Sequence, residues 1–152
     1  MVAVVEPGED GLGIVRGLAG GAVRRPGDGP PEGATPAQLA ALAERLGQSL
    51  PADLQAWLLV CNGAVIGPGG VFGQCPDRRG VDILAVRQRY PGWQRHGWIP
   101  VAGDGCGNFY VLTPEGTVSF IDTMIDPDML TSQPAADLLS FMTALLAADQ
   151  AP

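Results

Sequence analysis

Apolar residues along the middle of the chain first recur with the 3.6-residue spacing of an amphipathic helix. Thr35-Pro36-Ala37-Gln38 has the capping-box pattern, with proline at the first helical position, so a helix is expected to begin at Thr35. Gly47 is the residue type that ends a helix. The apolar face of this helix consists of Leu39, Leu42, Ala43 and Leu46.

Three further segments have helical spacing. A second helix is expected to restart at Pro51 and to end at Asn62-Gly63, since this pair accepts left-handed geometry. Its apolar face consists of Leu54, Trp57, Leu58 and Cys61, and Leu59 and Val60 widen it, which predicts burial on more than one side. Residues 81–84 fit a strand, but the helical spacing of Ile83, Val86, Arg87 and Tyr90 favours a short helix within 81–90 that ends before Pro91. A closing helix is expected to start near 132–134, with Asp137 in its first turn and an apolar stripe of Ala135, Leu138, Leu139, Met142, Leu145 and Leu146.

Extended segments dominate the region between the short helix and the closing helix. Strands are predicted at 98–102, 109–112 and 117–122, with turns at 103–108 and 113–116. This order predicts an α+β fold, in which helices pack mainly on one side of an antiparallel or mixed twisted sheet. The chain has the length of one domain. We place that domain at 35–148, after a weakly structured extension over 1–34 that is rich in glycine and proline.

An ordered set of short motifs resembles the SUKH superfamily, the Smi/Knr-type domain. The set consists of Leu46-Gly47, Leu50-Pro51, Asn62-Gly63, Gly70-Val71-Phe72-Gly73, Val81-Asp82-Ile83-Leu84, Trp98-Ile99-Pro100, Gly105-Cys106-Gly107-Asn108-Phe109-Tyr110 and the closing helix at 136–146. Asn108 stands where an aspartate is commoner. The resemblance implies the family's α+β fold and a protein-binding role, commonly that of a bacterial immunity protein which neutralises a toxin. It implies no catalytic residue and no cofactor.

Charge is unevenly distributed along the chain. Residues 1–95 contain nine acidic residues and nine arginines, whereas residues 96–152 contain seven acidic residues and no arginine or lysine. The whole net charge of −7 therefore lies in the last third. An acidic surface repels nucleic acid and anionic membranes and attracts basic proteins. With no membrane span and no signal peptide in the sequence, a cytoplasmic protein is expected.

Candidate catalytic residues are few. His96 is the only histidine, and it is expected in a polar surface loop before a strand. Cys106 lies in a glycine-rich turn, with no basic residue nearby in the sequence to lower its pKa. The spacing of Asp122, Asp126 and Asp128 is not that of an EF-hand. We therefore expect neither an enzyme nor a metal or cofactor site, since a base, a nucleophile and a ligand set are all missing.

A binding site is expected instead where acidic residues follow the strands. Asp104, Asp122, Asp126 and Asp128 connect or follow neighbouring strands, so their loops can gather at one end of the sheet. Among the three tryptophans, Trp57 and Trp98 are expected in the core and Trp93 on an exposed interface. The leading hypothesis is an immunity protein whose acidic face binds a basic toxin domain, such as a nuclease. The alternative is a scaffold or regulatory interaction domain of the same fold.

Overall fold

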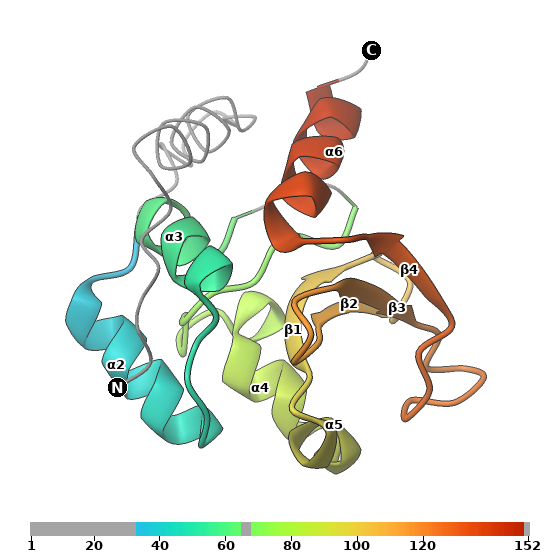
Figure 1. The fold of residues 1–152 in the computed structure, drawn as a ribbon, viewed down its shortest axis with the longest axis horizontal. Helices are drawn as coiled ribbons and strands as arrows, with labels where there is room; N and C mark the ends of the chain where they lie inside the picture. Colours follow the sequence, from blue (N-terminus) through green and yellow to red (C-terminus); the bar gives the residue numbers. More distant parts are fainter. Residues whose placement is uncertain (1–32, 65–67, 151–152) are drawn as a thin grey trace.

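The computed structural model describes residues 33–64 and 68–150, which form one sheet and the helices around it (Figure 1). The strands form an antiparallel sheet in the order β1-β2-β3-β4. The predicted α+β fold is confirmed. The expectations for 1–32 lie outside the described residues. The helical elements are α2 (Pro36–Leu46), α3 (Ala52–Val60), η1 (Arg79–Val81), α4 (Ile83–Gln88), α5 (Pro91–His96) and α6 (Leu138–Gln150), and the strands are β1 (Ile99–Gly103), β2 (Phe109–Leu112), β3 (Val118–Ile121) and β4 (Ser132–Ala135).

Helix α2 has the predicted boundaries and caps. The Thr35 hydroxyl accepts from the backbone N–H of Gln38 at 3.1 Å, and the Gln38 side chain accepts from the Thr35 N–H at 2.8 Å. The helix ends at Gly47, whose φ of 72° is in the left-handed region. Both capping predictions are therefore confirmed.

Helix α3 buries its predicted apolar face, but Leu59 beside that face is exposed. Leu54, Trp57 and Leu58 are all buried, and Cys61 follows them in extended backbone. Leu59, in contrast, is 42% exposed, so the prediction that it widens the buried face was wrong. It lies on the outer side of the helix, at the edge of a groove between α2 and α3. Gly63 has the positive φ expected at the Asn-Gly stop.

A helix replaces the loop that was expected around His96. The short helix before Pro91 is confirmed as α4, and a second one, α5, follows at once. Pro91 occupies the first turn of α5, and Gly97, with φ 71°, ends it. The glycines and arginine within 92–97 made this short segment resemble a loop. Pro91 nevertheless favours the start of a helix, and Gly97 favours its end.

The sheet has a fourth strand where the closing helix was expected to begin. β4 pairs with β3, and the Thr131 N–H and hydroxyl both donate to Phe120 O, at 2.9 and 3.0 Å. Pro134 lies within the strand, and α6 begins only after Asp137, whose carboxylate accepts from the Ser140 N–H at 2.7 Å. Asp137 therefore caps the helix rather than lying inside its first turn.

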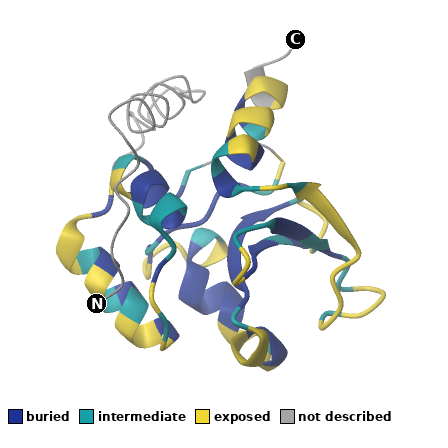
Figure 2. Ribbon diagram, in the orientation of Figure 1, coloured by how far each residue is buried: buried dark blue, intermediate teal, exposed yellow. Residues whose placement is uncertain are grey.

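Side chains of β2 join two parts of the core. Phe109 contacts the rings of Tyr90 and Trp93, at centroid distances of 5.7 and 5.6 Å. The next residue, Tyr110, points to the opposite face of the sheet and contacts Phe141 of α6 at 4.9 Å. Helices α4 and α5 thus support one face of the sheet, while α6 contacts the other. In Figure 2, buried residues lie along the strands and on α4, while exposed residues lie on the outer turns of α2 and α6.

Candidate functional site

The loops that carry the predicted acidic residues lie side by side. The β1–β2 turn (residues 104–108) and the loop between β3 and β4 (residues 122–131, called the acidic loop below) leave the same end of the antiparallel sheet. Thr123 joins them, because its N–H donates to Asn108 Oδ1 at 3.1 Å and its hydroxyl to Gly107 O at 2.8 Å. The structure therefore brings Asp104 to the same sheet end as Asp122, Asp126 and Asp128, as the sequence predicted.

The carboxylate of Asp104 organises the β1–β2 turn. It accepts from the N–H of Cys106 at 2.7 Å and from the N–H and side-chain amide of Asn108, at 3.0 and 2.9 Å. Partial burial alone would raise the pKa of Asp104, but these hydrogen bonds outweigh it and hold the pKa below its usual range. Asp104 is therefore negatively charged at neutral pH and fixed in position.

Carboxylates also shape the acidic loop from within. Asp122 Oδ1 accepts from the Met124 N–H at 3.0 Å, and Asp126 Oδ1 accepts from the Asp128 N–H at 2.9 Å. The backbone carbonyl of Asp122 accepts from the N–H groups of Ile125 and Asp126, both at 3.1 Å. Two successive turns of this kind give the loop a defined backbone, with Asp126 and Asp128 exposed on it.

Trp93 is not the exposed interface residue that the sequence suggested; that prediction was wrong. Its side chain is fully buried, stacked on Tyr90 at 4.4 Å, and its indole N–H donates to Pro127 O at 2.6 Å. Asp128 also lies directly against this helix, since a Cβ on Gly92 would come within 1.8 Å of Asp128 Oδ1. Helix formation at 91–96 turns Trp93 inward, where it supports the acidic loop from beneath. Trp57 and Trp98 are buried, as expected.

The sequence reading missed the apolar side chains of the acidic loop. Between and after the aspartates, Met124 is 88% and Ile125 67% exposed. Met129 and Leu130 are 42% and 38% exposed. The loop projects beyond β3 and β4 (Figure 1) and is exposed along most of its length (Figure 2). The available signal was four apolar residues in a segment too short and too polar to be a helix or a strand.

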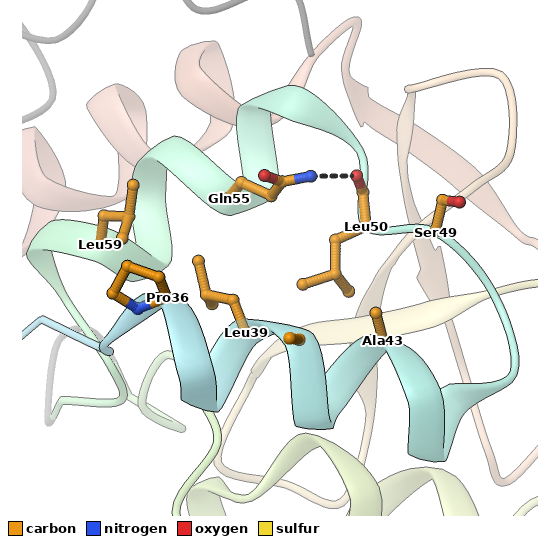
Figure 3. Close-up of a pocket in the computed structure, with 8 residues that line it drawn as sticks. Pro36, Leu39, Ala43, Ser49, Leu50, Gln55 and Leu59 are labelled. Carbon is orange, nitrogen blue, oxygen red and sulfur yellow. Dashed lines mark hydrogen bonds between the residues drawn. The ribbon is translucent and has the colours of Figure 1, made fainter. Parts of the chain in front are cut away.

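A shallow apolar groove of about 400 Å³ lies between helices α2 and α3 (Figure 3). Leu39, Leu50 and Leu59 line it, and the Gln55 side chain donates to Leu50 O at 2.8 Å across one end. Its lining includes no acid, histidine or arginine, so the groove itself offers no acid–base chemistry.

The candidate catalytic residues are separate from one another. His96 is exposed at the end of α5 and stacks on Trp98 at 4.2 Å, and Cys106 is exposed in the β1–β2 turn. Burial raises the pKa of the Cys61 thiol to about 12, which keeps it protonated and unreactive. In residues 33–64 and 68–150, no cluster of three or more potential ligands is placed to hold a metal ion. None of the helices described there is both long and apolar enough for a membrane crossing.

Helices α2 to α5 precede the antiparallel sheet and α6 closes the chain, which defines a small α+β domain with an acidic end of the sheet. The family model described as SMI1 / KNR4 family (SUKH-1) matches residues 33–143, and the chain belongs to this family. The resemblance seen in the sequence is thereby confirmed. Members of the family are commonly immunity proteins. None of the curated proteins compared with the chain matches it.

Proposed function

We propose that this protein is an immunity protein, which binds a basic toxin domain in the cytoplasm and neutralises it without catalysis. The observation that carries the proposal is the gathering of Asp104, Asp122, Asp126 and Asp128 at one sheet end. No arginine or lysine follows Arg95 in the sequence, so this end has no basic residue from its own segments to neutralise it. A toxin that acts on nucleic acid has a basic cleft, which such a surface complements.

The four carboxylates act mainly on the rate of encounter. Exposed charges steer a partner of opposite charge toward the surface, and salt screens them over about 8 Å at physiological ionic strength. Replacing Asp122, Asp126 and Asp128 together by asparagine should therefore slow association and flatten its dependence on salt. Asparagine keeps an oxygen that can accept the same backbone hydrogen bonds, so the loop should keep its shape.

The test begins with the genes on either side of this protein's gene: where one of them encodes a polypeptide toxin, that toxin is co-expressed with this protein. Wild-type protein should rescue cell growth, and the triple asparagine variant should bind the purified toxin domain several-fold more slowly at low salt. An unchanged association rate would move the interface away from the acidic loop. A failure of wild-type protein to rescue growth or to bind would contradict the immunity role and leave the alternative, a scaffold or regulatory interaction domain.

A further inference from the structure

The exposed apolar residues of the acidic loop have no structural reason to lie in water. Met124 and Ile125, 88% and 67% exposed, follow β3 at the tip of a loop that turns back into β4. Isolated exposed apolar residues are common, but Met129 and Leu130 follow them in the same loop. Four such side chains within the seven residues 124–130 mark a contact surface.

The loop backbone is held in place before any partner arrives. Its two ends are fixed by the bonds from Thr123 to the β1–β2 turn and from Thr131 to Phe120 O. Its middle is fixed by the bond from the Trp93 indole to Pro127 O, and its turns by Asp122 and Asp126. A loop ordered in advance loses little conformational entropy on binding, which is the property that makes exposed side chains effective anchors.

Charge restricts what can cover this surface. Three aspartates alternate with the apolar residues, so a second copy of the chain would bring like charges together, and an anionic membrane would be repelled. A partner that matches both features has an apolar recess bordered by arginine or lysine. Such an arrangement, with apolar anchors at the centre and charges at the rim, is the usual energetic layout of a protein interface.

We infer that Met124 and Ile125 are the anchor residues of the interface, and that they insert into an apolar recess, bordered by basic residues, on the partner protein. This inference rests on the proposed function and names the chemistry of the partner's contact surface. The two groups of side chains then have different kinetic roles. The aspartates set the association rate, and the apolar anchors set the dissociation rate.

The test uses the full-length chain and a catalytically inactive form of the toxin domain encoded by the neighbouring gene. Met124→Ser/Ile125→Ser should raise the dissociation rate at least about tenfold and leave the association rate nearly unchanged, because anchor residues act mainly on dissociation. Leu59→Ser is the matched control: Leu59 is 42% exposed, lies in α3 and should leave both rates unchanged. Thermal melts should show all variants folded, since the changed side chains are exposed.

The outcomes distinguish a failure of the anchor inference from a failure of the immunity role. If wild-type protein binds but the double serine variant dissociates at the wild-type rate, the anchors lie elsewhere and the immunity role stands. If Leu59→Ser accelerates dissociation equally, the effect is not specific to the loop and the inference is wrong. If wild-type protein sediments as a dimer that the double variant abolishes, the loop is a self-association surface and the inference is overturned. If wild-type protein binds no toxin domain, the proposed function fails, and the inference fails with it.

Discussion

At the scale of single residues, the three tryptophans are all buried but have different contacts. Trp57, Trp93 and Trp98 are all buried, although the polar neighbours of Trp93 indicated exposure. Only Trp93 has an indole N–H that donates to the acidic loop. Sequence neighbours could not reveal this, because the partner atom, Pro127 O, is 34 positions away. The burial of Trp57, in contrast, was predictable from the apolar face of its own helix.

Trp57→Ala should lower the free energy of unfolding by roughly 3–5 kcal/mol, the range for removing a large buried aromatic side chain. Trp57 is fully buried in the core, and its indole N–H is one of the buried polar groups without a hydrogen-bond partner in residues 33–64 and 68–150. Trp57→Phe keeps most of the volume and removes that N–H, so it should cost clearly less. Chemical denaturation measures both. A loss below about 1 kcal/mol for the alanine variant would contradict the core position of α3.

Trp93→Phe should loosen the acidic loop without unfolding the protein. Phenylalanine retains the stacking on Tyr90 but cannot donate to Pro127 O, so hydrogen exchange of the loop amides should accelerate. The global loss should exceed about 1 kcal/mol, the value of a typical hydrogen bond, because the smaller ring also leaves space in the core. Trp98→Phe serves as the control, because Trp98 stacks on His96 and should leave loop exchange unchanged. Equal exchange in all three proteins would mean that Trp93 does not support the loop.

At the scale of elements, the sequence predicted what local signals determine and missed what distant contacts determine. The caps of α2 and the strands β1 to β3 follow from residues within each segment. β4 does not: it takes its extended form from the bonds of Thr131 to β3, while its own residues Ser132-Gln133-Pro134-Ala135 lack strand character. α5 was missed for another reason, because the polar residues between Pro91 and Gly97 resemble a loop. The acidic residues of the candidate site could be predicted because charge is visible in a sequence. The exposed apolar residues of the loop could not, because exposure is a property of the folded chain.

Asn108 joins the β1–β2 turn to the acidic loop, so replacing its amide should change the stability of the protein. Its side-chain amide donates to Asp104 Oδ2 at 2.9 Å, while its Oδ1 accepts from the Thr123 N–H. Asn108→Asp, which restores the residue commoner in the family, would set two carboxylates against each other and lower the melting temperature at pH 7. Repulsion raises the folded-state pKa values of such a pair above their unfolded values, so the folded state holds the extra proton. The loss should therefore shrink as pH falls through those raised values toward about 4, the usual range of aspartate.

The reciprocal exchange provides the control. Asp104→Asn/Asn108→Asp keeps one amide and one carboxylate at the junction, so it should recover most of the stability lost in Asn108→Asp. Melting curves from pH 4 to pH 7 distinguish the variants. If Asn108→Asp melts at the wild-type temperature throughout this range, the amide bond to Asp104 does not hold the junction together.

At the scale of the whole molecule, the first described residues already contact helix α3. The Ala34 N–H donates to Leu58 O at 2.7 Å, and a Cβ on Gly33 would collide with Leu59 O. The family match also begins at residue 33. We propose, as the sequence suggested, that residues 35–148 are the folding unit and that residues 1–34 precede it as an extension. This division places the acidic sheet end and both candidate loops entirely within the folding unit.

A chain that begins at residue 33 should therefore fold and melt within a few degrees of the full-length protein. It retains the α2 cap at Thr35, the Ala34 bond to Leu58 and the core cluster described within residues 33–64 and 68–150. Circular dichroism melts of the two chains make the comparison. A fall of more than about 8 °C would correspond to a loss of roughly 2 kcal/mol in a domain of this size, and would mean that the extension stabilises the fold.

The edge strand β4 affects how readily the protein aggregates at high concentration. β1 is covered at its outer side by Val71, which bridges to Ala102, whereas β4 is the last strand in the sheet. An uncovered edge is a template on which a foreign strand can pair and start aggregation. β4 has only four residues, one of them Pro134, which has no N–H to offer an incoming strand. A short edge strand that contains proline is a poor template for such pairing, so this edge should resist aggregation although the acidic loop beside it is exposed.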